Sequence, residues 1–337
     1  MTRATALLAV ALACGVLASG AQPQRQADRY LVYTRAIGSS NQAVWIGDIE
    51  GRRMRRLTRG GYGLVSPDGE TIAVSRRSGI FTIRPDRSGG RFVARGRPTE
   101  WLPDSRHLLA VQRKALVRID VVDGSVDVID RREVLASSIS PDGQSIAYEV
   151  NRRRVPSGEC WFDVYAARVD RSARRRLTEG GRSSTPAWGA KWIAYAYRPP
   201  GTGCFKPRIW RMDADGGSKA PLMRTLPERF GNTGYYGVRP FAWVKGRPLL
   251  LATIPTEWGA ELALVDIRDG RTWKPDLDPR PRYRRSMYVD DASGDGRHVV
   301  GAACGAELPC TIQIYSVLDG RRRDVVTGSA AYPDWNR

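Results

Sequence analysis

The sequence predicts an all-β chain folded as a single β-propeller of four-stranded blades. Two stretches are nearly identical, "SPDGETIAVS" at 66–75 and "SPDGQSIAYE" at 140–149. Each joins a tight Ser-Pro-Asp-Gly turn to alternating apolar residues, the pattern of a half-buried strand. Five weaker copies complete seven units that recur about every 45 residues, the period of a propeller blade. No helical periodicity is sustained along the chain.

The apolar strand after each turn, termed strand B, is the best-marked element of every unit. Its seven copies are YLVYTR from Tyr30, TIAVSR from Thr71, HLLAVQ from His107, SIAYEV from Ser145, WIAYAY from Trp192, PLLLAT from Pro248 and HVVGAA from His298. A loop and a strand C ending in a polar turn follow, and then a strand D that is arginine-rich in several units. Each unit therefore supplies strands B, C and D in order.

Strand A precedes the turn, and four of its seven copies carry tryptophan at one register: Trp101, Trp188, Trp243 and Trp335. We expect these indoles to pack between blades. The last copy has no strand B after it, and the first unit has no strand A before it. We therefore expect 331–337 to pair with 30–35, which closes the ring and removes two exposed sheet edges. Seven blades are predicted, with six as the alternative.

The repeat resembles the TolB-type propeller repeat, a relative of the WD-type repeat. The likeness is carried by "SPDGETIAV", "LPDSRHLLAV", "SPDGQSIAYE", "RIWRMDADGG" and "RRRLTEGG", and it covers about residues 27–337. It implies a propeller and little about function, because such blades occur in transport accessory proteins, peptidase accessory domains and scaffolds. We count seven units where TolB has six, and we find no separate N-terminal domain before them. A role in the TolB envelope system is therefore not implied.

The N-terminal residues 1–21 have the pattern of a secretory signal peptide: Arg3, an apolar run over 4–18 and small residues over 19–21. The mature propeller domain is then expected over 22–337. Cys14 offers the alternative of a lipid anchor. No later stretch is apolar for long enough to cross a bilayer. We expect an extracytoplasmic protein, secreted or periplasmic.

One end of the predicted ring carries the long connections. The A-to-B and C-to-D turns are short, whereas the B-to-C and D-to-A connections at the other end contain the insertions, an arrangement typical of a binding face. Arginines and aromatic residues on those connections suit a protein or peptide partner, with a carbohydrate as an alternative. The candidate binding residues are Arg152, Arg153, Arg154, Tyr235, Tyr236, Arg239, Trp258, Arg282, Arg284 and Arg285. The alternative for the two tyrosines is packing in the core.

Four cysteines lie beyond the predicted signal peptide, and all four fall in B-to-C connections: Cys160 and Cys204 in two neighbouring units, and Cys304 and Cys310 together in one. An oxidising compartment favours disulfides, and four cysteines allow three pairings. We expect Cys160 with Cys204, which would join neighbouring blades, and Cys304 with Cys310, which would close one loop. No C-x-x-C pair occurs, so zinc or thiol redox chemistry has little support.

The net charge of +19 permits an anionic partner. Of the 54 basic residues six are lysine, leaving 54 − 6 = 48 arginines, and runs at 52–56, 174–176 and 321–323 fall where strand D begins, at the outer rim. Charged outer strands protect a sheet against edge pairing, and this interpretation is preferred to nucleic-acid binding.

Catalysis has little support in the sequence. The two histidines, His107 and His298, occupy one register of the repeat, and no G-x-S-x-G elbow occurs. The leading hypothesis is a non-enzymatic, monomeric binding or scaffold protein without cofactor or metal. One alternative is a lyase or lactonase-like enzyme acting in the central funnel. The other is a binder of an anionic polymer through its arginines.

Overall fold

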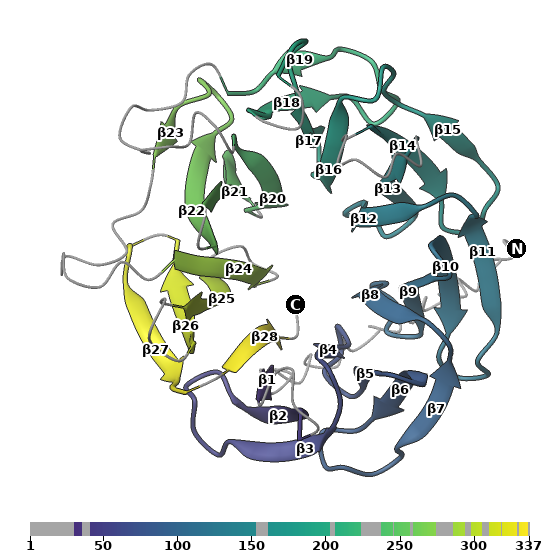
Figure 1. Ribbon diagram of the computed structural model, residues 1–337, viewed down its shortest axis with the longest axis vertical. Helices are drawn as coiled ribbons and strands as arrows, with labels where there is room; N and C mark the ends of the chain where they lie inside the picture. Colours follow the sequence, from purple (N-terminus) through teal and green to yellow (C-terminus); the bar gives the residue numbers. More distant parts are fainter. Residues whose placement is uncertain are drawn as a thin grey trace, which may run out of the picture.

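The computed structural model describes residues 30–35, 41–152, 161–202, 206–223, 237–244, 246–256, 259–273, 286–293, 298–304, 310–317, 319–328 and 330–335. Seven four-stranded antiparallel sheets are arranged in a ring around a central axis (Figure 1). The chain is therefore a seven-bladed β-propeller, as the repeat predicts, and the six-bladed alternative is wrong. No helix in the described part of the chain is long and apolar enough to span a membrane.

The blades follow one another along the chain. Blade 1 holds β28 (Ala330–Trp335), β1 (Tyr30–Arg35), β2 (Ala43–Asp48) and β3 (Arg55–Arg59); blade 2 holds β4 (Gly63–Val65), β5 (Ile72–Arg76), β6 (Gly79–Ile83) and β7 (Arg91–Ala94). Blade 3 holds β8 (Arg97–Trp101), β9 (His107–Gln112), β10 (Ala115–Asp120) and β11 (Val126–Asp130); blade 4 holds β12 (Val134–Ile139), β13 (Ser145–Asn151), β14 (Phe162–Arg168) and β15 (Arg174–Arg176). Blade 5 holds β16 (Ser183–Trp188), β17 (Ile193–Tyr197), β18 (Arg208–Met212) and β19 (Ala220–Pro221). Blade 6 holds β20 (Arg239–Trp243), β21 (Leu249–Thr256), β22 (Gly259–Asp266) and β23 (Thr272–Trp273); blade 7 holds β24 (Ser286–Ala292), β25 (His298–Cys304), β26 (Thr311–Ser316) and β27 (Arg322–Val326).

The C-terminal strand closes the ring as predicted. Strand β28 pairs with β1, placing Leu31 opposite Trp335 and Arg35 opposite Ala330, and it supplies the innermost strand of blade 1 (Figure 1). The carboxylate of Asp334 also accepts the N–H of Val65 in blade 2, at 2.7 Å. The closing strand is therefore bonded to the blades on both sides of the junction.

The repeated Ser-Pro-Asp-Gly turn has a local cause. In the first copy Asp68 accepts the hydroxyl of Ser66 at 2.5 Å and the N–H of Glu70 at 3.0 Å, and Gly69 adopts the left-handed φ of +75° that the turn requires. The second copy, around Asp142, repeats these contacts. This chemistry lies within one segment, so the sequence predicts it well.

The tryptophan register joins one blade to the next. The indole N–H of Trp101 donates to the carbonyl of Leu64 at 3.0 Å, and that of Trp243 donates to Ala187 at 2.8 Å. Each acceptor lies on the innermost strand of the preceding blade. The predicted role between blades is confirmed for these two tryptophans; the side chain of Trp335 lies outside the described residues.

Arginines on the outermost strands make a second, repeated contact between blades. In four blades an arginine of strand D donates to a carbonyl in the C-to-D turn of the next blade. The pairs are Arg55 with Pro85, Arg91 with Val121, Arg175 with Ala214 and Arg323 with Ile49. These arginines share one register of strand D, opposite Ile46, Thr82, Ala166 and Ile314. In blade 3 the position holds Asp127, which pairs with Arg171 of the next turn at 3.2 Å. We call the four arginine-to-carbonyl pairs of blades 1, 2, 4 and 7 the arginine latches.

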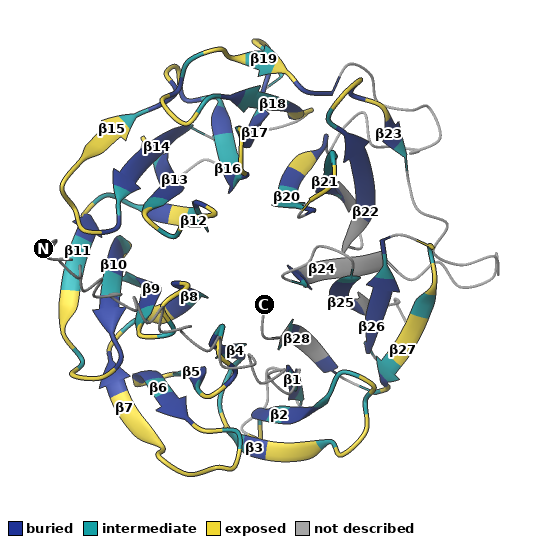
Figure 2. Ribbon diagram, turned by 180° about the vertical axis from the view of Figure 1, so that it is seen from behind, coloured by how far each residue is buried: buried dark blue, intermediate teal, exposed yellow. Residues whose placement is uncertain are grey.

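The outer strands are the most exposed part of the ring, whereas strands B and C are buried (Figure 2). The arginine runs at 52–56, 174–176 and 321–323 lie where these outer strands begin, as predicted. The latches use four of the arginines on the outer strands for contacts between blades. Part of the high arginine content therefore has a structural cause.

Most of the innermost strands are bulged. The pairing of strand A with strand B shifts register in β8, β12, β16, β20, β24 and β28. A bulge leaves an extra residue out of the ladder and redirects side chains locally. The innermost layer of strands is therefore the irregular part of an otherwise regular repeat.

Candidate functional site

Two cavities open at the end of the ring that carries the B-to-C and D-to-A connections. The channel cavity, of about 1220 Å³, is lined by segments of blades 1 to 4 near the central axis of the ring. The basic cleft, of about 730 Å³, lies between blades 3 and 4. Their described lining consists mainly of short turns and strand ends, with Asn151 and Arg152 at the start of one insertion.

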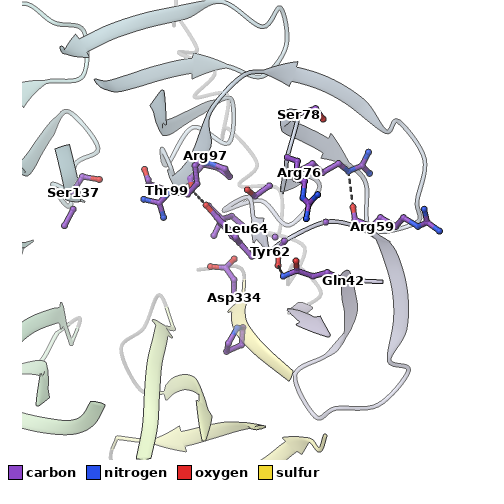
Figure 3. A pocket seen from close by; sticks show the side chains of 18 of the residues that line it. Gln42, Arg59, Tyr62, Leu64, Arg76, Ser78, Arg97, Thr99, Ser137 and Asp334 are labelled. Atoms are coloured by element: carbon purple, nitrogen blue, oxygen red, sulfur yellow. Dashed lines mark hydrogen bonds between the residues drawn. The ribbon is translucent and has the colours of Figure 1, made fainter. Parts of the chain in front are cut away.

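The channel cavity has a rigid wall where blades 1, 2 and 3 meet (Figure 3). The hydroxyl of Tyr62 donates to the carbonyl of Pro98 at 2.6 Å, and burial raises the pKa of Tyr62. Arg76 donates to the carbonyl of Arg59 at 3.0 Å and lies over the ring of Phe81 at 4.3 Å. These contacts hold polar side chains around the opening.

Two bulged strands bring unusual groups to this cavity. The hydroxyl of Thr99, in the bulge of β8, is buried and makes no hydrogen bond with any described residue. Leu135, in the bulge of β12, is 47% exposed. A buried hydroxyl without a partner costs free energy, and an exposed leucine leaves apolar surface in water. The cavity wall therefore contains one polar group without a hydrogen bond to a described residue and one apolar side chain exposed to solvent.

The basic cleft contains six cationic side chains and one lining carboxylate, that of Glu133. The cations are Arg113, Lys114, Arg131, Arg132, Arg152 and Arg176. Arg113 and Lys114 form the two-residue turn between β9 and β10, and Arg131 and Arg132 lie on the connection from blade 3 to blade 4. Together with Arg152 after β13 and Arg176 at the end of β15, four separate segments of chain therefore place positive charge around one opening.

Two buried aspartates fix part of this charge. Asp130, which is 1% exposed, binds Arg132 at 2.5 Å and accepts the hydroxyl of Tyr148 at 2.8 Å. Burial opposes its ionisation, but the bonds from Arg132 outweigh that cost and the pKa of Asp130 is lowered. The guanidinium of Arg132 also lies over the ring of Tyr165 at 3.8 Å.

Asp163 is fully buried beneath the other side of the basic cleft. It pairs with Arg176 at 2.8 Å and with Arg152 at 3.4 Å, and it accepts the N–H of Gly181 at 3.1 Å. The aspartates therefore set the directions of three arginines whose own side chains remain partly exposed.

A third buried carboxyl, Glu149, lies in β13 of blade 4. It is 6% exposed, and its Oε2 accepts the N–H of Thr185 at 2.6 Å. Thr185 sits in the bulge of β16 with a φ of +45°, which is uncommon for a β-branched residue. Burial raises the pKa of Glu149, and the opposing effects of the Thr185 N–H and the charge of Arg239 are smaller. Raised carboxyl pKa values are common at functional sites.

Of the ten candidate binding residues, the structure describes Arg152 and Arg239. Arg152 lines the basic cleft at the end of β13. Arg239 is exposed at the start of β20, on the same end of the ring, and is not part of that cleft. The remaining candidates, Arg153, Arg154, Tyr235, Tyr236, Trp258, Arg282, Arg284 and Arg285, lie outside the described residues. Their roles stay predictions.

The cysteine pairing also stays a prediction. Cys310 is disulfide-bonded, but its partner is not among the described side chains. Cys160 and Cys204 lie outside the described residues, and Cys304 ends β25 with its side chain outside the description. Among the described residues no group of three or more histidine, cysteine, aspartate or glutamate side chains is placed to hold a metal ion.

Sequence reasoning favoured long loops and therefore missed the residues on short turns. Tyr62, Thr99 and Leu135 of the channel cavity carry no signal in the sequence beyond their place at the start of strand A. Arg113 and Lys114 do carry one, because a two-residue hairpin turn without glycine or asparagine is unusual. Glu149 carries another, as the one acidic residue of an otherwise apolar strand B.

No family model matches the chain, and no curated protein matches it by sequence. Several solved structures match the chain in fold. TolB from Acinetobacter baumannii superposes with a TM-score of 0.54 at 16% identity, covering 91% of this chain and 66% of that one. The fold is the propeller that TolB also contains. At such identity the likeness shows the fold alone.

Other structures extend this likeness. The β-propeller domain of the trilobed protease from Pyrococcus furiosus gives a TM-score of 0.63 at 16% identity, covering 89% of this chain and 95% of that one. It is described as having an open velcro topology, whereas here β28 closes the ring on β1. An oligogalacturonate lyase in complex with manganese gives 0.56 at 14% identity, covering 88% and 84%. The chain spans 66%, 52% and 49% of the first three structures it resembles.

Proposed function

We propose that this chain is a non-enzymatic, extracytoplasmic propeller that binds a protein or peptide partner in the channel cavity. The observation that carries the proposal is the cavity itself, with its bulged wall, the unbonded hydroxyl of Thr99 and the exposed Leu135. At about 1220 Å³ it exceeds the range of roughly 300–1,000 Å³ typical of small-molecule pockets. A polypeptide segment fits such a volume better than a metabolite does.

The lining has the chemistry of a protein interface. The exposed Leu135 and four arginines, Arg59, Arg76, Arg77 and Arg97, share the lining, and arginine is enriched where proteins meet. Export rests on the signal peptide predicted over 1–21, and the mature domain over 22–337 rests on the same prediction. The TolB likeness agrees with a binding role without identifying the partner.

The test is a pull-down from extracytoplasmic extract with the mature protein and two variants. Leu135→Asp places a charge in the channel cavity. Val122→Asp is the matched control, because Val122 is 62% exposed on a C-to-D turn at the opposite end of the ring. We expect partners to be lost from the first variant and kept by the second. Equal capture by both would overturn the proposal.

A second candidate function is an enzyme, and the observation that favours it is Glu149, a buried carboxyl bonded to β16 that lines neither of the two cavities. A buried carboxyl with a raised pKa is suited to general acid or base chemistry. Activity toward lactones or uronate oligosaccharides that disappears in Glu149→Gln would support this function. Identical turnover by the two proteins would remove Glu149 from the reaction.

A further inference from the structure

We propose that the basic cleft between blades 3 and 4 binds a small organic anion carrying at least two oxyanion groups, carboxylate or phosphate. This site is separate from the channel cavity, and the inference does not depend on the function proposed there. It rests on the charge of the cleft, on two arginines that pair with no described residue, on a strained turn and on the volume enclosed.

Positive charge exceeds negative charge in the cleft. Six cationic side chains line it, and four carboxylates pair with them: Glu133, Asp130, Asp163 and Glu179. The difference is 6 − 4 = 2 positive charges. In a partly enclosed site this charge is screened less than on an open surface. A multiply charged anion is the ligand that such a site favours.

The excess is located on particular side chains. Lys114 pairs with Glu133 at 3.0 Å, and the two aspartates engage Arg132, Arg152 and Arg176. The side chains of Arg113 and Arg131 are exposed and make no hydrogen bond or ion pair with any described residue. Guanidinium groups bind carboxylates and phosphates through paired N–H donors. Two such groups at one opening can receive two oxyanions.

The turn that carries Arg113 is strained. Arg113 and Lys114 have φ values of +49° and +76°, in a two-residue hairpin where Asn-Gly is the favoured pair. By contrast, the corresponding two-residue turn of blade 2, Arg77–Ser78, has no positive φ, and the positive φ of +136° next to it falls on Gly79 at the start of β6. Strain of this kind persists where it serves a function, and here it places two cations at the cleft instead of the residues that would best stabilise the turn.

The volume sets the size of the ligand. At about 730 Å³ the cleft lies within the roughly 300–1,000 Å³ typical of small-molecule sites. It is far larger than one inorganic oxyanion requires. The anion is therefore expected to carry its charged groups on an organic framework.

The test is isothermal titration of the mature protein with citrate and with pyrophosphate, at low and high salt. Citrate alone binding would identify carboxylates, pyrophosphate alone would identify phosphates, and binding of both, weakened by salt, would identify the charge itself as the determinant. Each of these results supports the site. Dissociation constants above about 10 mM for both probes would overturn it, because such affinity is weaker than ordinary ligand binding.

The decisive variant is Arg113→Asn with Lys114→Gly, which removes two cations and relieves the strained turn. We expect affinity to fall at least tenfold while the melting temperature rises, so unfolding cannot explain the loss. Arg131→Gln provides a second variant with an intact turn and should also weaken binding. Arg247→Gln, an exposed arginine on a turn at the opposite end, should bind as the wild type does. Unchanged affinity in both cleft variants would contradict the proposal, whereas Leu135→Asp should leave this site intact.

Discussion

Replacing all four latch arginines with methionine should destabilise the ring in proportion to the number of latches removed. Methionine keeps most of the side-chain stem but removes the donor and the charge. A hydrogen bond contributes about 0.5–1.5 kcal/mol, and these are exposed, so each latch is expected to contribute about 0.5 kcal/mol. The four latches lie in different blades, so their effects should add to about 2 kcal/mol. A single replacement is near the limit of detection, whereas the quadruple variant is not.

Urea denaturation at pH 7 measures this difference, and the variant carries Met at Arg55, Arg91, Arg175 and Arg323. Removing four positive charges also relieves repulsion in a protein of net charge +19, so the control must remove four as well. Arg53, Arg84, Arg95 and Arg247 suit this purpose because they are exposed and their side chains make no hydrogen bond or ion pair with described residues. Equal stability of the latch variant and this control variant would refute the reasoning.

Two further predictions concern buried carboxyls. Asp163→Asn should lower the free energy of unfolding, measured in urea, by about 2 kcal/mol, because it removes the negative charge that pairs with Arg176 and Arg152. The loss is limited to this size because both guanidinium groups remain partly in contact with water. A free energy of unfolding within error of the wild-type value would contradict this prediction. Glu149→Gln should become more stable relative to wild type as the pH rises above 4.5, since a raised pKa in the folded state means that ionisation of Glu149 destabilises the fold. The two proteins should converge below that pH, and a gap independent of pH would show that ionisation is not the cause.

The fold was predictable because its signals are local and repeated. The bonds of Asp68 to Ser66 and Glu70 lie within one five-residue segment, and the same segment recurs around Asp142. Strand B follows each turn directly, so its position needs no knowledge of the neighbouring blades. Ring closure was predictable too, because the first unit lacks strand A and the last strand A lacks a strand B. Pairing these two strands with each other leaves neither edge exposed.

The cavities were not predictable in the same way, because they depend on contacts between units. The basic cleft joins Arg113 and Arg131, from two different connections, with Arg176 from the end of β15 in the next blade. Leu135 and Thr99 lie in β-bulges, where the pairing of strand A with strand B shifts register. The residue types at these positions do not predict such a shift. Loop length directed attention to the end of the ring where Arg152 lines the basic cleft, but it does not distinguish a short turn that carries charge from one that merely connects strands.

Site-specific photo-crosslinking tests the central claim most directly, namely that ligands bind at the B-to-C and D-to-A end of the ring. A crosslinking residue is placed at Leu135 in the channel cavity and, separately, at Val122 on the opposite end, and each protein is irradiated in extracytoplasmic extract. The account predicts a discrete crosslinked partner from position 135 and none from position 122. A partner captured from position 122 alone would place the binding surface at the other end and contradict the account.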